Sequence, residues 1–264
     1  MNRIELRLRS GKQLIPFLMA GDPNLEVTLD LIQMLQEEEV AAIEIGVPFS
    51  DPTADGPAIQ LAAERSLRKK TYLKDVLLLG KQAQARGLDV PLILFSYSNP
   101  LYQYGFQELI HDAHQSGFEG IIVPDLPYEE SLALRALAES YGIAVIPLVA
   151  PTSGARMEKI VEGASGFIYC VSSVGTTGVR TTFNPEVELF LNEVRRVSPV
   201  PIAVGFGISQ VEHVRYFHQH ADSVIVGSAF VQQIEAVSHL LTQLETRSEG
   251  ISMLRQFVRT LKSK

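Results

Sequence analysis

Eight short apolar runs, separated by longer segments of helical periodicity, limit most strongly what this chain of 264 residues can fold into. The runs are apolar almost throughout, without polar residues at alternate positions, which is typical of strands buried on both faces of a parallel sheet. They are Ile15–Ala20, Ala41–Val47, Leu92–Ser96, Gly120–Val123, Ala144–Val149, Gly166–Val171, Pro201–Val204 and Ser223–Val226. Strands that alternate with helices predict crossover units, and eight such units favour a closed (β/α)8 TIM barrel over an open doubly wound sheet.

The connections between these runs predict the helices. Apolar residues three and four positions apart, such as Val27 and Leu31, mark amphipathic faces. The connection after the second run is too long for one helix, so we expect an extra helix at about Pro57–Arg68 before the regular helix at about Leu73–Arg86. A further helix, at Glu249–Leu261, is expected beyond the eighth unit.

The composition bounds the class of protein. The length fits one barrel of about 250 residues, and no linker or low-complexity tract divides the chain, so we expect residues 1–264 to form a single domain. A hydrophobic content of 46% is ample for a core. The formal net charge of -7 argues against binding to nucleic acid or to an acidic membrane, because both require clustered Lys and Arg.

The expected location is the cytoplasm. No segment approaches the roughly 18 uninterrupted apolar residues of a spanning helix. The first residues also lack the apolar stretch of a secretory signal. The single cysteine, Cys170, cannot form an internal disulfide, and its apolar neighbours predict a buried thiol on a strand.

Three acidic residues lie in or after the second run, and the carboxyl ends of barrel strands are where active sites form. Glu44 lies between Ile43 and Ile45, so it points into the barrel if both isoleucines face the helices. It is then either a structural ion pair or solvated rim residue, or a general acid/base whose pKa is raised by burial. Asp51 and Asp55 follow in a loop stiffened by prolines. Each fits a turn, Asp51 more readily than Asp55.

Glycines follow the sixth, seventh and eighth runs, at Gly175–Gly178, Gly205–Gly207 and Gly227–Ser228. Barrels of this kind often bind phosphate between the last loops and a helix N-terminus. Glycine lets the backbone approach an anion, and free N–H groups bind it. Glycines at three consecutive strand ends therefore predict a phosphate site.

The sequence predicts no metal site and no nucleotide cofactor. Its six histidines fall mostly in helical segments, away from carboxylates at strand ends. Neither a dinucleotide-binding fingerprint nor a phosphate loop is present. Asp125, which ends the fourth run, fits equally well as a helix N-cap or as a site residue.

Four segments resemble the tryptophan synthase alpha chain family: Phe17–Pro23, Glu44–Gln60, Pro124–Glu130 and Gly205–Ser209. The resemblance runs over nearly the whole chain in the same order, and the second segment is highly specific. It implies cleavage of indole-3-glycerol phosphate to indole and glyceraldehyde 3-phosphate. It also implies an alpha2-beta2 heterotetramer with a beta chain that carries pyridoxal phosphate, while this chain carries no cofactor.

The resemblance also implies roles for individual residues. Glu44 matches the acid/base of the retro-aldol cleavage, and Asp55 matches the carboxylate that holds the indole N–H. The remaining matches are grouped by role. Substrate-binding positions are Phe17, Tyr97, Asp125, Tyr169 and Thr177; phosphate-binding positions are Gly178, Gly207, Gly227 and Ser228; positions at the interface with the beta chain are Pro48, Asp51 and Pro127.

Two loops depart from the family pattern. Thr53 replaces a usual leucine, and Thr176, within Ser172–Arg180, replaces an apolar residue that many relatives have. Both changes affect loops that close over substrate in the family. An alternative is therefore a catalytically weak alpha chain that mainly activates its beta chain. A third reading is a phosphosugar isomerase barrel, which would share the phosphate site but would not need the proline-rich acidic loop.

Overall fold

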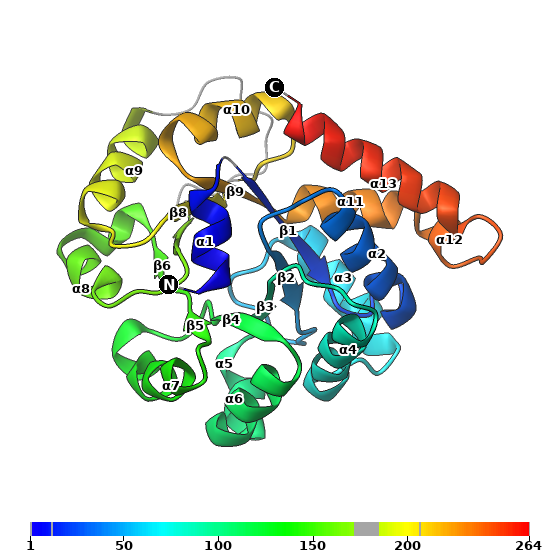
Figure 1. The fold of residues 1–264 in the computed structure, drawn as a ribbon, viewed down its shortest axis with the longest axis horizontal. Coiled ribbons are helices and arrows are strands. Elements are labelled where there is room, and N and C mark those ends of the chain that lie inside the picture. Colours follow the sequence, from blue (N-terminus) through cyan, green and yellow to red (C-terminus); the bar gives the residue numbers. More distant parts are fainter. Residues whose placement is uncertain (1, 12, 172–184, 206, 264) are drawn as a thin grey trace.

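The computed structural model describes residues 2–11, 13–171, 185–205 and 207–263 as a ring of parallel strands surrounded by helices (Figure 1). The described strands are β1 (Gln13–Met19), β2 (Ile43–Gly46), β3 (Leu92–Phe95), β4 (Phe118–Ile122), β5 (Ala144–Val145), β6 (Leu148–Val149), β7 (Ile168–Val171), β8 (Ile202–Gly205) and β9 (Ser223–Val226). Each of the eight apolar runs therefore contains strand, and the fifth contains two.

The helices follow in the order expected of crossover units. They are α1 (Arg3–Arg9), α2 (Leu25–Glu37), α3 (Pro57–Arg68), α4 (Leu73–Ala85), α5 (Ser98–Tyr104), α6 (Phe106–Gln115), α7 (Tyr128–Ser140), the short 3-10 helix η1 (Pro151–Arg156), α8 (Met157–Val161), α9 (Pro185–Val197), α10 (Val211–His220), α11 (Ser228–Ala236), α12 (Ser238–Leu241) and α13 (Arg247–Lys262). The extra helices predicted after the second run and at the C-terminal end are confirmed as α3 and α13. The sequence did not predict α5, η1 or α12.

The break in the fifth strand lies at Pro147, which has no N–H to donate to a neighbouring strand. The strand order runs from β5 through β4, β3, β2, β1, β9, β8 and β7 to β6. The two ends of this order, β5 and β6, are halves of one extended segment. Ile146 N–H donates to Ile121 O on one side, and Tyr169 N–H donates to Pro147 O on the other, both at 2.9 Å. The sheet therefore closes on itself, and the predicted (β/α)8 barrel is confirmed.

Alternate strand residues face the barrel interior and the helices. Ile43 and Ile45 belong to the outer core between strands and helices, whereas Ala42 belongs to the inner core with Ile93 and Ile225. Glu44 has the same parity as Ala42 and therefore points inward, as predicted. Cys170, in the outer core, is fully buried, which confirms the predicted buried thiol on a strand.

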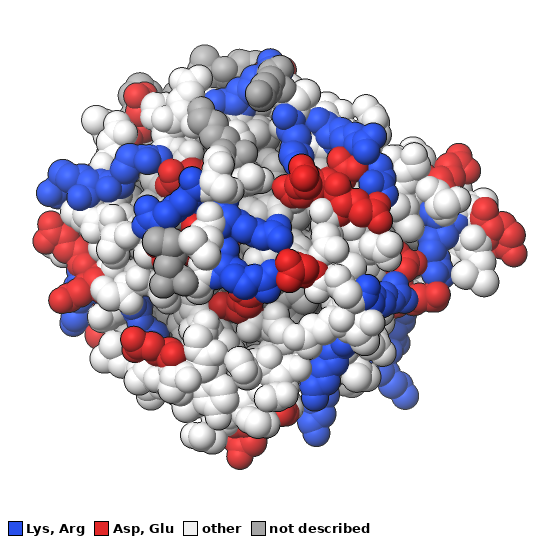
Figure 2. All heavy atoms as spheres, viewed as in Figure 1, with Lys and Arg blue, Asp and Glu red and all other residues white. Residues whose placement is uncertain are grey.

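Helix α1 covers the end of the barrel at which the strands begin (Figure 1). Its Ile4 and Leu8 are buried in the inner core. Its arginines are paired on the surface: Arg3 contacts the Glu119 carboxylate at 2.8 Å, and Arg9 contacts that of Glu5 at 2.9 Å. Acidic and basic side chains are interspersed over this face (Figure 2). Chemistry is therefore expected at the opposite end, where the strands finish.

The C-terminal helix α13 is held against the end of α2 by Glu38. This carboxylate is 9% exposed and accepts hydrogen bonds of 2.9 Å from both Arg255 and Arg259. The hydrogen bond from Arg259 is the main cause of a lowered Glu38 pKa.

We expect Glu38→Gln to lower the free energy of unfolding by about 2 kcal/mol, between the values for exposed and buried ion pairs. Because the folded-state pKa is depressed, this contribution is present above the unfolded-state pKa and is lost as the pH falls through the folded-state value. Urea unfolding at pH 7 and pH 3 measures it. Glu37→Gln, which removes an exposed partner of Arg255, is the control, and an equal loss in both variants would contradict the prediction.

Candidate active site

Glu44 is the most perturbed carboxylic acid at the carboxyl end of the barrel. It is 1% exposed, and its strand neighbours in register are Phe17 on β1 and Ile93 on β3, both buried. Among the described residues, no hydrogen-bond partner is found for its Oε1. Burial, and secondarily the charge of Asp55, raises the pKa of Glu44 to about 8. The side chain is therefore protonated at neutral pH.

Asp55 lies at the end of the loop that joins β2 to α3, next to the N-cap residue Gly56. Burial raises its pKa to about 6, while a hydrogen bond from the Tyr97 hydroxyl lowers it in part. Asp51, in the same loop, is exposed, and its carboxylate accepts a hydrogen bond from the Ser50 hydroxyl. The two aspartates that the sequence left open therefore differ: Asp55 is partly buried and its charge raises the pKa of Glu44, whereas Asp51 is exposed.

Tyr97 connects this loop to the barrel. It is buried at the end of β3, as the N-cap residue of α5. Its hydroxyl oxygen accepts a hydrogen bond of 3.1 Å from Ala54 N–H, and its ring stacks on Phe49 with centroids 5.4 Å apart. The tyrosine therefore contacts this acidic loop near both its beginning and its end.

An apolar wall lies beside Glu44. The rings of Phe17 and Phe95 meet edge to face, with centroids 5.5 Å apart. The Phe17 ring occupies the space that a side chain at Gly46 would need, so only glycine fits at that position. The wall offers an aromatic surface at the side of the carboxyl groups.

Tyr169 approaches the acids from β7. Burial raises its pKa well above the usual value, and the charges of Glu44 and Asp55 add to this effect. Its hydroxyl lies over Gly205 at the end of β8, 2.6 Å from where a Cβ at that position would be. Glu44, Asp55, Tyr97 and Tyr169 therefore surround one region at the mouth of the barrel.

Asp125, at the end of the fourth strand segment, is exposed and does not cap the helix that follows it. Its Oδ1 accepts a hydrogen bond of 2.8 Å from Ser98 N–H, and its Oδ2 accepts one of 2.7 Å from the Ser98 hydroxyl. Because Ser98 is the first residue of α5, the carboxylate sits at the positive end of that helix.

The structure describes only some of the residues that were predicted to bind phosphate. Gly207 follows β8 with a φ of +62°, and none of the described atoms lies within 4 Å of where its Cβ would be. Gly227 is the N-cap residue of α11, and Ser228 is the first residue of that helix, which no side-chain hydrogen bond caps within the described part of the chain. Thr177 and Gly178 lie outside the described residues, as does Thr176.

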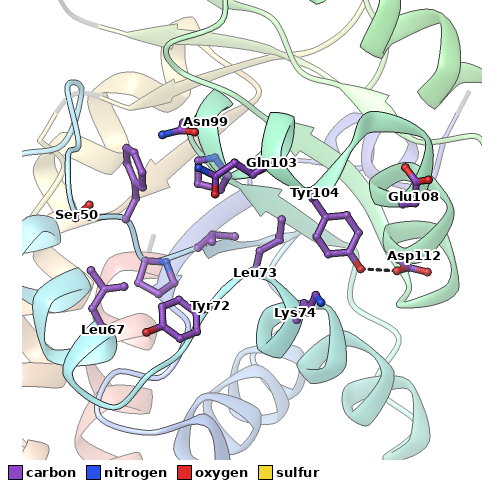
Figure 3. Close-up of a pocket in the computed structure, with 14 residues that line it drawn as sticks. Ser50, Leu67, Tyr72, Leu73, Lys74, Asn99, Gln103, Tyr104, Glu108 and Asp112 are labelled. Atoms are coloured by element: carbon purple, nitrogen blue, oxygen red, sulfur yellow. Dashed lines mark hydrogen bonds between the residues drawn. The ribbon is translucent and has the colours of Figure 1, made fainter.

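A separate groove of about 710 Å³ lies beside the site, between the acidic loop and helices α3 to α6 (Figure 3). Pro48 and Phe49 line it, so Phe49 contacts both the groove and Tyr97. The sequence did not predict this groove. Two of its polar lining residues lie on α5, which was also not predicted and which only the length of chain between the third and fourth strands signalled. The polar lining residues are Ser50, Lys74, Asn99, Gln103, Glu108 and Asp112.

The described ranges contain neither a metal-binding cluster nor a membrane-spanning helix. No three of their His, Cys, Asp and Glu side chains come together in a way that could hold a metal ion. No helix placed there combines the length and the apolar character needed to cross a membrane.

The sequence matches known proteins over almost its full length. The family model for the tryptophan synthase alpha chain matches residues 4–263. The alpha chain of Shouchella clausii is 45% identical over 259 residues, which cover 98% of this chain and 96% of that protein. The alpha chain of a Geobacillus species is 46% identical over 247 residues, which cover 94% of each.

Solved structures agree with this assignment. Tryptophan synthase subunit alpha from Legionella pneumophila superposes with a TM-score of 0.85 at 34% identity, covering 98% of this chain and 99% of that one. A chain from the tryptophan synthase a2b2 complex of Pyrococcus furiosus gives 0.84 at 35% identity, with coverages of 95% and 97%. The barrel, with two carboxyl groups of raised pKa at its mouth, agrees with these matches. This chain belongs to the tryptophan synthase alpha chain family.

Proposed function

We propose that this chain cleaves indole-3-glycerol phosphate to indole and glyceraldehyde 3-phosphate, as the alpha subunit of tryptophan synthase in tryptophan biosynthesis. The observation that carries the proposal is the pairing of Glu44 with Asp55 at the mouth of the barrel. Their surroundings raise the two pKa values to different levels, about 8 and about 6, so that near pH 7 one is an acid and the other a base.

The reaction is a retro-aldol cleavage that needs two proton transfers. Protonated Glu44 gives its proton to C3 of the indole, which turns the ring into a cationic indoleninium. The resulting Glu44 carboxylate then takes the proton of the adjacent side-chain hydroxyl. The carbon–carbon bond breaks, its electron pair neutralises the ring, and the hydroxyl carbon becomes the aldehyde. Glu44 ends protonated, so the cycle is balanced.

Asp55 stabilises the charged intermediate. Its carboxylate accepts a hydrogen bond from the indole N–H, whose positive charge grows as C3 is protonated. The hydrogen bond from Tyr97 favours the ionised form of Asp55. Phe17, Tyr169, Asp125 and Thr177 are assigned to the indole ring and the glycerol chain by their match to the family; Thr177 lies outside the described residues.

The phosphate group is proposed to bind at Gly178, Gly207, Gly227 and Ser228. The uncapped N-terminus of α11 supports this placement, because free N–H groups and the helix dipole attract an anion. The open space beside Gly207 also supports it.

We expect Gly207→Ala to raise KM about tenfold while changing kcat little. Its methyl group would enter the proposed phosphate space, and the left-handed backbone disfavours alanine by about 1 kcal/mol. Steady-state kinetics measure the effect. Gly163→Ala is the matched control, because its φ is +65° and its surroundings are equally open, but it follows α8 at the opposite end of the barrel. Equal changes in KM in the two variants would refute the phosphate assignment.

The proposed partner is the beta chain in an alpha2-beta2 heterotetramer. The groove supports this, since Pro48 lines it, and Asp51 and Pro127 are exposed at the same end of the barrel. Pyridoxal phosphate is assigned to the beta chain and no cofactor to this one. A single barrel domain acting in the cytoplasm fits this role.

Indole release, measured with and without a beta chain, tests the proposal. We expect turnover that the beta chain increases. Turnover only in the presence of the beta chain would favour the alternative, a catalytically weak alpha chain that mainly activates its beta chain. The departures from the family pattern at Thr53 and Thr176 suggested that alternative. Absence of turnover in both conditions would refute the lyase assignment. Competition by a ribulosyl-type phosphate, without competition by an indole-bearing one, would favour the isomerase alternative.

A further inference from the structure

Hydrogen bonds and one covalent link connect the end of the fourth strand with the loop between β2 and α3. It begins at Asp125, whose two carboxylate oxygens accept the N–H and the hydroxyl of Ser98. Ser98 is bonded in sequence to Tyr97, whose hydroxyl accepts Ala54 N–H at 3.1 Å and so lies beside Asp55, the next residue, whose pKa it lowers. Asp125 therefore contacts the segment that holds Tyr97, and Tyr97 contacts Asp55.

We propose that Asp125 is a positioning residue that holds Tyr97 where its hydroxyl can orient and stabilise the Asp55 carboxylate. Asp125 is exposed, and both of its oxygens already accept hydrogen bonds from the start of α5. The N-terminus of a helix favours a carboxylate, so this contact fixes the first turn of α5. Tyr97 is the N-cap residue, directly before that turn, so the turn sets the position of its backbone.

The inference rests on the proposed function only for the catalytic role of Asp55. The effect of Asp125 on Asp55 through Tyr97 is a property of the protein without substrate. Among the described residues, the titratable groups that face Asp55 are Glu44 from β2, Tyr97 from the start of α5 and Tyr169 from β7. Of these, Tyr97 is the one whose hydrogen bond lowers the pKa of Asp55. Loosening Tyr97 should therefore raise that pKa.

The direction in which the Asp55 pKa changes distinguishes loss of the Tyr97 contact from loss of the Asp125 charge alone. Removing the negative charge of Asp125 would by itself lower the pKa of Asp55, in any variant that lacks the carboxylate. Loss of the Tyr97 hydrogen bond raises it instead. Asp125→Asn loses the charge but keeps the cap, since its amide oxygen accepts Ser98 N–H and its NH2 donates to the Ser98 hydroxyl oxygen.

The test is a pH titration of the Asp55 carboxyl carbon by 13C NMR in the substrate-free chain, assigned by the signal missing from Asp55→Asn. We expect Asp125→Ala to raise the Asp55 pKa by about half a unit. Asp125→Asn should restore the Asp55 pKa of the wild type. Tyr97→Phe should raise the Asp55 pKa, and combining it with Asp125→Ala should raise that pKa no further. Asp75→Ala, which removes a carboxylate that accepts Tyr72 N–H at the start of α4, is the matched control and should leave it unchanged.

An unchanged or lowered Asp55 pKa in Asp125→Ala would overturn the inference. So would equal shifts in Asp125→Ala and Asp125→Asn, or additive shifts with Tyr97→Phe. Because no turnover is measured, failure of the wild-type chain to release indole would count against the proposed function and would leave this result standing.

Discussion

Glu44→Gln abolishes indole release, with kcat at least about 10³-fold below that of the wild-type chain, while substrate binding is largely retained. Glutamine keeps the shape of the protonated acid but has no proton to give to indole C3 and cannot accept one from the hydroxyl. One side chain performs both transfers in the proposed mechanism, so no part of the cycle survives. Steady-state kinetics with the beta chain present, together with calorimetric titration of substrate, measure the two quantities separately.

Stability provides an independent check on the same variant. A folded-state pKa raised from 4.5 to about 8 means that Glu44 stabilises the fold fully below pH 4.5 and loses this contribution as the pH rises through 8. Glutamine does not titrate, so the variant should have a higher Tm than the wild type at pH 8 to 9. A lower Tm there would show that Glu44 is paired rather than desolvated.

The control for Glu44→Gln is Glu119→Gln. Glu119 lies on β4 near the beginning of the strand, is 19% exposed in its side chain, and has a pKa raised by burial. It contacts Arg3 on the face opposite the proposed site. We expect this variant to keep cleavage within about twofold, as for a residue outside the site. Near-normal turnover in Glu44→Gln would refute the catalytic assignment.

Asp55→Asn lowers kcat by about 10²- to 10³-fold, the usual cost of losing one electrostatic stabiliser of a transition state. Asparagine can still accept the Tyr97 hydrogen bond, so the loop should stay in place. The missing charge would destabilise the indoleninium and lower the pKa of Glu44, because the Asp55 charge raises it. The loss should therefore appear in kcat more than in KM.

Glu64→Gln is the control for Asp55→Asn, because it removes one negative charge from an exposed position on α3. Surface charges of this kind contribute little, so we expect kcat within about twofold of the wild type. Comparable losses in the two variants would mean that overall charge, and not the position of the Asp55 carboxylate, controls the rate.

Much of the fold could be predicted from periodicity. Strands buried on both faces produce apolar runs, and amphipathic helices produce the three-and-four spacing, so α3 and α13 were placed closely in advance. The split of the fifth strand was not predicted, although Pro147 signals it, because proline lacks the N–H that a continuous ladder requires. Helix α5 was also missed, since seven residues give too little periodicity to recognise.

Only part of the site could be predicted from the sequence. The inward direction of Glu44 follows from strand alternation, a local property that the sequence contains. The contact of Tyr97 with the acidic loop joins residues 43 positions apart, and that of Asp125 with Ser98 joins residues 27 positions apart. Such contacts depend on which strands are neighbours in the closed barrel, so the capping role of Asp125 and the groove beside α5 became visible only in three dimensions.

The most direct test of a protonated Glu44 at neutral pH is the pH dependence of kcat/KM for indole release, which reports the ionisations of the free enzyme. The upper limb is the diagnostic one, because the substrate phosphate also titrates, with a pKa of about 6, on the lower limb. We predict that kcat/KM falls with rising pH around an apparent pKa near 8, as the proton of Glu44 is lost. A value that stays constant or rises beyond pH 9 would contradict the account.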